Sequence, residues 1–151
     1  MNFIIKTIPQ KAQFSKIPDS NNHVAYGAYL FNAAACGDCH TKKEEGAPVA
    51  GMELAGSFEF PLPKGGTVWS ANITQDNDTG IGNWTEEIFL QKFKTYQDST
   101  YRSPEVKEGE FNTIMPWTMY STMKEDDLKA IYAYLLTVKP VKNKVEKFSK
   151  N

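Results

Sequence analysis

The chain has 151 residues, of which 40% are hydrophobic and 13% aromatic, so it is long and apolar enough for one domain with a buried core. Seventeen basic residues against eighteen acidic ones give a net charge of −1, which argues against a nucleic acid as the partner. The opening run Met1–Ile5 is too short to be a signal peptide, and no apolar run is long enough to span a membrane.

The first part of the chain predicts an arm followed by a helix. Residues 1–18 mix apolar and basic side chains with two prolines, which is typical of an extended segment. Good N-cap residues follow at Asp19, Ser20 and Asn21. They predict a helix from about Asn22 to Ala35.

A short motif, Cys36-Gly37-Asp38-Cys39-His40, follows this helix and contains the only two cysteines of the chain. Two thiols at this spacing can each add across one vinyl group of a haem. The histidine directly after the second cysteine then lies under the ring, where its imidazole can ligate the iron. The motif therefore predicts a haem attached through Cys36 and Cys39 and ligated by His40.

Three other interpretations of the cysteine pair are less favoured. A disulfide between Cys36 and Cys39 would close a very small loop and stabilise little. A thioredoxin-like redox pair requires a helix start after a strand, whereas a helix is predicted ahead of this motif. A zinc site normally needs four ligands, and His23 is the only other histidine.

The segment from residue 41 to residue 85 predicts mostly loop. Prolines and glycines interrupt residues 41–66, whose short apolar stretches can line a cofactor pocket, and residues 67–70 predict a short strand. Residues Asp76–Gly80 resemble part of a calcium loop but lack its full spacing and its glutamate at the twelfth position. A tight turn is the favoured interpretation and calcium the alternative.

Two further helices are predicted. Thr85 is an N-cap for the first of them, with Glu86 and Glu87 in its first turn. For the last helix, Thr122 and Glu125 have the spacing of a capping box, and an amphipathic pattern continues to about Val138. The lysine-rich tail, residues 141–151, is expected to lie on the surface or to fray. The sequence thus predicts an arm over residues 1–18, a domain over 19–140 and a basic tail over 141–151.

Three methionines precede the last helix, and each is a candidate for the second iron ligand. Met115 lies before Pro116, which favours an extended backbone and keeps the chain out of helix. Met123 lies inside the predicted capping box, so its side chain is expected to pack against the helix start. Met119 can reach toward a haem, but nothing in the sequence fixes its backbone. Met115 is therefore the favoured candidate.

The order of these elements resembles class I cytochrome c, an all-α fold of three to five helices and long loops around one covalently attached haem. In that family the first and last helices cross near a glycine and an aromatic residue, here Gly27 and Phe31 against Ile131 and Tyr134. Two departures are visible. Gly27 and Phe31 lie one position further from Cys36 than in the shorter cytochromes, so the last turn before the motif must be adjusted.

The second departure is Lys124, which replaces the usual serine or threonine N-cap of the last helix, so Thr122 is expected to cap instead. A closer resemblance, from Tyr26 onward, is to the cytochrome c subunits of periplasmic alcohol, aldehyde and related dehydrogenases. It is carried by five segments, namely ACGDCHT at 35–41, SANIT at 70–74, TGIGNWT at 79–85, MPW at 115–117 and DLKAIYAYL at 127–135.

This resemblance implies one haem c per chain, with His40 and Met115 as axial ligands. It further implies that Trp69, Asn72 and Trp84 contact the cofactor, with hydrogen bonds to its propionates. The aromatic side chains expected to bury the ring are Phe58, Phe60, Trp69, Trp84 and Trp117.

The implied function is single-electron transfer between a dehydrogenase and an oxidase or another cytochrome, and not catalysis. The alternative is a haem enzyme or a gas-binding sensor, either of which needs an open or labile sixth position on the iron. Because bacteria attach haem covalently outside the cytoplasm, the resemblance also implies a periplasmic or otherwise extracytoplasmic protein. We expect its natural form to carry an export signal or a membrane anchor.

Overall fold

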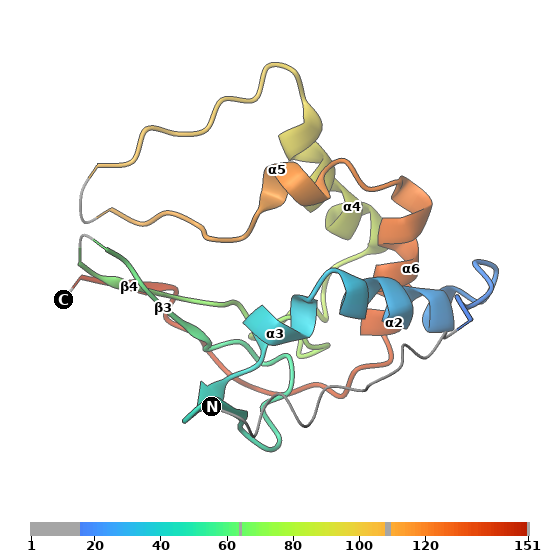
Figure 1. The fold of residues 1–151 in the computed structure, drawn as a ribbon, viewed down its shortest axis with the longest axis horizontal. Helices are drawn as coiled ribbons and strands as arrows, with labels where there is room; N and C mark the ends of the chain where they lie inside the picture. The colour runs from blue at the N-terminus through green and yellow to red at the C-terminus, as the bar shows by residue number, and fades with distance from the viewer. Residues whose placement is uncertain (1–15, 64, 108–109, 151) are drawn as a thin grey trace, which may run out of the picture.

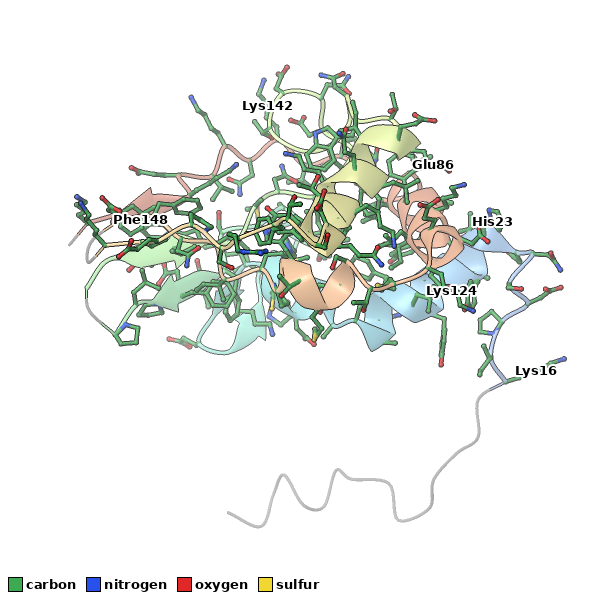
Figure 2. All side chains as sticks on the ribbon, turned by 90° about the horizontal axis from the view of Figure 1, so that it is seen from above. Lys16, His23, Glu86, Lys124, Lys142 and Phe148 are labelled. Atoms are coloured by element: carbon green, nitrogen blue, oxygen red, sulfur yellow. The ribbon has the colours of Figure 1, made fainter. Side chains whose placement is uncertain are left out.

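The computed structural model describes residues 16–63, 65–107 and 110–150, so most of the arm predicted for residues 1–18 lies outside the described ranges. Helices gather at one end of the molecule and small strands at the other (Figure 1). Viewed from above, His23, Glu86 and Lys124 lie toward the helical end, and Lys142 and Phe148 lie toward the other (Figure 2).

The helices of the described residues surround one apolar core. They are α2 (His23–Ala33), α3 (Cys36–His40), α4 (Glu86–Lys94), α5 (Trp117–Tyr120) and α6 (Glu125–Leu135), with a 3-10 turn η1 (Thr95–Gln97). The buried core side chains come from α2, α4, α6 and two loops, and they are Phe31, Leu54, Ile81, Phe89, Leu128, Ile131, Tyr132 and Leu135.

Two small antiparallel sheets make the all-α expectation incomplete. One is a hairpin of β1 (Lys43–Glu44) and β2 (Ala47–Pro48), and the other has the order β3-β4-β5, formed by Glu59–Pro61, Thr67–Trp69 and Phe148–Ser149. The short strand expected near residues 67–70 is β4, so that prediction is confirmed. The connection between β3 and β4 contains Gly65 and Gly66, whose φ values are +92° and +88°. Glycine adopts such positive φ values without the steric cost that other residues have, so these two residues suit the tight connection.

Helices α2 and α6 cross at Gly27, as the sequence predicts. A Cβ atom added to Gly27 would lie 1.8 Å from the carbonyl oxygen of Ala130 and 3.1 Å from the backbone nitrogen of Ile131. Beside this contact, the rings of Phe31 and Tyr134 lie 5.1 Å apart between centroids. The absence of a side chain at Gly27 therefore allows the two helix backbones to touch.

The helix N-caps agree with the sequence at one of three places. Thr85 caps α4, because its side chain accepts the N–H of Ile88. The cap of α2 is Asn22, not residues 19–21, and its side-chain oxygen accepts the N–H of Ala25. At α6 the prediction for Thr122 is wrong.

Thr122 does not cap α6, because its hydroxyl donates to the carbonyl of Met119 at 2.8 Å, within the preceding turn. Lys124 takes the N-cap position without a side-chain hydrogen bond. Three carboxylates in the first turn, Glu125, Asp126 and Asp127, interact favourably with the helix dipole instead. The helix also ends at Leu135, earlier than the predicted Val138.

The tail from residue 141 packs against the rest of the domain over the residues that are described. The N–H of Asn143 donates to the hydroxyl of Thr79 at 3.0 Å, and its side chain donates to the carbonyl of Ala55 at 2.8 Å. Further on, Phe148 is paired with Val68 in the three-stranded sheet. A boundary at residue 140 therefore does not separate two structural units.

We predict that Gly27→Ala destabilises the protein by about 3 kcal/mol or more, because the new methyl group would force the α2 and α6 backbones apart. Urea unfolding followed by circular dichroism measures the effect. Gly37→Ala is the matched control, since a Cβ there would lie 3.5 Å from the Phe31 ring, an ordinary contact distance. Equal stability of the two variants would show that the crossing tolerates a larger separation.

Candidate haem site

The cysteine motif forms the separate short helix α3, which is set off from α2 by a break in the backbone. Helix α2 ends at Ala33, and Ala35 takes a left-handed conformation with φ of 54°. The expected adjustment of the last turn before the motif is therefore present. The sequence predicted a helix running to Ala35, and the extra residue between Phe31 and Cys36 instead produces this break.

The two cysteines of the motif differ in exposure. Cys36 is half-buried beside the core, and Cys39 is exposed; both are free thiols. Burial raises the pKa of the Cys36 thiol to about 11. Since this place disfavours a thiolate, it suits an uncharged sulfur such as a thioether.

The imidazole of His40 is fixed by a carbonyl from another loop. Its Nδ1 lies 2.7 Å from the oxygen of Ala71. Because a carbonyl oxygen only accepts hydrogen bonds, Nδ1 carries the proton and Nε2 keeps its lone pair for a metal. Burial also lowers the pKa of His40, which favours the neutral ring that a metal needs.

Among the three candidate methionines, Met115 lines a pocket. It is half-buried in a pocket of about 170 Å³ together with Tyr96, Tyr101 and Trp117. Met119 is 58% exposed. Met123, which was expected to pack against the helix start, packs against the hydrophobic core.

An aromatic stack forms the wall behind Met115. The rings of Tyr96 and Trp117 are 5.2 Å apart and nearly parallel, Phe93 lies 5.3 Å from Trp117, and Tyr101 lies 5.0 Å from Tyr96. The sequence did not predict this role, because Tyr96 continues the apolar stripe of the preceding helix and Tyr101 lies in the polar, irregular residues 97–112. The two tyrosines are five residues apart, which is not a helical spacing, and Trp117 lies near them in the fold but far away in the sequence. No periodic pattern therefore indicated the stack.

The structure does not bring Trp69 and Trp84 to the pocket of Met115. Trp69 lines a different hollow, with Lys144 and Glu146 of the tail. Trp84 packs against the hydrophobic core, and its carbonyl accepts the hydroxyl of Tyr132. Both residues therefore have contacts within the protein, and their contact with the haem propionates stays a prediction.

Asn72 is a buried hydrogen-bonding centre rather than a free donor. It is 4% exposed. Its amide nitrogen donates to the Thr79 hydroxyl at 3.1 Å and to the Val141 carbonyl at 2.8 Å. Its amide oxygen accepts the N–H and the hydroxyl of Thr74 at 2.9 and 2.8 Å. Both polar atoms of this side chain thus have partners within the protein, and its predicted contact with a propionate stays a prediction.

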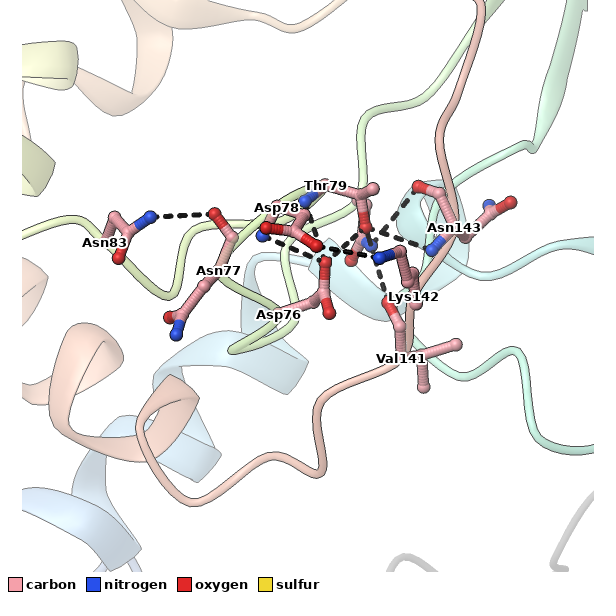
Figure 3. Close-up of polar contacts among 9 residues, drawn as sticks. Asp76, Asn77, Asp78, Thr79, Asn83, Val141, Lys142 and Asn143 are labelled. Carbon is pink, nitrogen blue, oxygen red and sulfur yellow. Dashed lines mark hydrogen bonds and ion pairs between the residues drawn. The ribbon is translucent and has the colours of Figure 1, made fainter.

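Residues 76–80 form the tight turn that the sequence favours over a calcium loop (Figure 3). The Asp76 carboxylate accepts the Thr79 hydroxyl at 2.6 Å and the N–H groups of Asp78 and Thr79. The hydrogen bond from the Thr79 side chain is the main cause that lowers the pKa of Asp76. Lys142 of the tail pairs with Asp78 at 2.7 Å.

Among the residues described, no three His, Cys, Asp or Glu side chains are grouped as a metal site would require.

A family model of cytochrome c matches residues 24–139, which is most of the chain. The chain belongs to the cytochrome c family. The fold and the motif geometry agree, because α2 and α6 cross beside a covalent-attachment sequence whose histidine is oriented by a carbonyl. Membership of this family implies a covalently bound haem c.

This cytochrome is similar to the cytochrome subunits of three dehydrogenases. The fructose dehydrogenase cytochrome subunit of Gluconobacter japonicus is 33% identical over 78% of the chain and 22% of the relative. The gluconate 2-dehydrogenase cytochrome c subunit of Pantoea cypripedii is 29% identical over 90% of the chain and 28% of the relative. The cytochrome c subunit of alcohol dehydrogenase (quinone) of Gluconacetobacter polyoxogenes is 34% identical over 84% of the chain and 25% of the relative. The chain thus spans about a quarter of the length of these relatives.

The residues of the cytochrome fit a covalently held haem. The motif offers two thiols and an imidazole nitrogen, and Met115 offers a thioether in an aromatic pocket. The segment around Met115 also exposes large apolar side chains, with Phe111 48%, Ile114 42% and Met119 58% accessible. Such side chains gain free energy when a porphyrin face covers them.

Asn72→Ala is expected to cost about 2–3 kcal/mol of unfolding free energy, because it leaves the buried N–H of Thr74 without its acceptor and removes the shorter of the two hydrogen bonds to the Val141 carbonyl. Urea unfolding of the haem-loaded protein measures this cost. Asn83→Ala removes an exposed amide that donates to the Asn77 carbonyl, and should stay within about 0.5 kcal/mol. A large change in reduction potential with unchanged stability in Asn72→Ala would contradict this structural role and favour a contact between Asn72 and a propionate.

Proposed function

We propose that this cytochrome domain transfers single electrons through one haem c bound to Cys36 and Cys39, with His40 and Met115 as axial ligands. When bound, the haem supplies an iron that alternates between the ferrous and ferric states. The observation that carries the proposal is the hydrogen bond from His40 Nδ1 to the Ala71 carbonyl, since it leaves the ring nitrogen opposite Nδ1 free for the iron.

The chain's own residues orient and support the proposed ligands. The Ala71 carbonyl holds the imidazole in one orientation, and its partial negative charge makes the ring a stronger donor. On the opposite side, Met115 offers a neutral thioether, which favours the reduced iron over the oxidised one. Tyr96 and Trp117 line the same pocket as Met115, so their rings would lower the polarity around that sulfur and act in the same direction.

A dehydrogenase is the proposed electron donor, and an oxidase or another cytochrome the acceptor. The proposal is supported by the similarity to cytochrome subunits of fructose, gluconate and alcohol dehydrogenases. Haem attachment of this kind further supports a periplasmic or otherwise extracytoplasmic location. In the part of the chain that the structure describes, no helix has the length and apolarity of a membrane span.

Covalent attachment predicts that the denatured, haem-loaded protein keeps its haem, which mass spectrometry detects as the peptide plus one haem. Cys36→Ala and Cys39→Ala should each leave at most one thioether. Haem that extracts completely from the parent protein into acidic acetone would contradict the attachment. A mass with more than one haem would contradict the proposed stoichiometry.

Met115→Ala is expected to abolish the weak far-red charge-transfer band from methionine sulfur to ferric iron. It should also lower the reduction potential by on the order of 0.1 V, within the ~0.8 V that axial ligands span. Met119→Ala is the matched control, because its exposed side chain should leave the band and the potential nearly unchanged. Loss of the band in the control but not in Met115→Ala would assign the ligand to Met119. A parent protein without the band, binding carbon monoxide readily, would favour a sensor or an enzyme.

A further inference from the structure

One side chain joins the segment that carries Met115 to the backbone directly ahead of the cysteine motif. The hydroxyl of Tyr120, on the short helix α5, donates to the carbonyl of Ala34 at 2.7 Å, across 86 positions of sequence. The contact is partly buried. Burial raises the pKa of the Tyr120 hydroxyl, so it stays a donor at any physiological pH. In Figure 1, α5 lies over α3 accordingly.

The carbonyl of Ala34 needs this partner because of the break in the backbone. In a continuous α-helix it would accept the N–H of Asp38, four residues on. Here Ala35 is left-handed, and the N–H of Asp38 donates to Ala35 at 3.1 Å instead. The extra residue between Phe31 and Cys36 thus releases the Ala34 carbonyl, and Tyr120 satisfies it.

Tyr120 is connected to Met115 through a rigid turn. The N–H of Trp117 donates to the Met115 carbonyl at 2.8 Å, and the N–H of Tyr120 donates to the Pro116 carbonyl at 3.2 Å. These bonds leave little freedom between the two residues. Fixing the Tyr120 hydroxyl therefore also fixes the backbone of Met115 relative to α3.

We propose that Tyr120 is a positioning residue for the distal iron ligand: its hydrogen bond to Ala34 sets how Met115 faces the haem held by the motif. This inference rests on the proposed His40/Met115 ligation. Tyr120 touches neither the iron nor the reaction itself. Removing its hydroxyl loosens the methionine side of the site before the fold as a whole is lost.

The test heats the haem-loaded ferric protein and follows two signals. The charge-transfer band reports methionine on the iron, and far-ultraviolet circular dichroism reports the fold. In Tyr120→Phe the midpoint for loss of the band should fall by about 4 °C or more relative to the midpoint of unfolding. The reduction potential should fall as well.

Tyr132→Phe is the matched control, because it removes a partly buried tyrosine hydroxyl that donates to the Trp84 carbonyl beside the core. It should lower both midpoints together and leave the potential unchanged. Tyr120→Phe behaving like this control, or like the parent protein, would overturn the positioning role. If Met115→Ala loses the band while Tyr120→Phe changes nothing, only the role of Tyr120 fails. If Met115→Ala keeps the band, the ligand assignment fails and the role of Tyr120 with it.

Discussion

The contact between Gly27 and the backbone of Ala130 is the constraint on which the rest of the structure depends. A Cβ at Gly27 would lie 1.8 Å from the Ala130 carbonyl oxygen, so only glycine lets α2 and α6 approach this closely. The crossing fixes the end of α2, and thereby the place where the cysteine motif begins. It equally fixes the start of α6, and thereby the end of the segment that carries Met115. One helix crossing thus holds the segments that carry the two proposed iron ligands, His40 and Met115.

The loops complete what the crossing begins. The Ala71 carbonyl orients His40 at 2.7 Å, and its neighbour Asn72 holds the turn at Thr79 and the tail at Val141. The hydrogen bonds of one short segment therefore connect the imidazole to the C-terminal part of the chain. An irregular loop becomes a precise support here because buried polar groups must find partners, and each partner specifies one arrangement.

Local signals in the sequence predicted the parts whose structure is decided locally. The cysteine motif, the close approach at Gly27, the Thr85 cap and the turn after Asp76 all follow from residue types at short spacing. Where distant residues compete, the sequence did not suffice. The amide of Asn72 donates to the carbonyl of Val141, 69 positions away, a contact that no local pattern indicates. The pairing of Phe148 with β4 was likewise invisible, because strand pairing depends on partners some 80 residues away.

The most direct test of the ligand arrangement is the proton and carbon NMR spectrum of the reduced, haem-loaded protein, labelled at the methyl groups of its five methionines. A methionine on the iron lies over the porphyrin, whose ring current shifts its methyl signal far upfield. We expect one such signal, and we expect it to disappear in Met115→Leu while the other methionine signals keep their positions. Five methyl signals in the ordinary range, or a shifted signal that persists in Met115→Leu, would contradict the arrangement of His40 and Met115 on opposite sides of one haem.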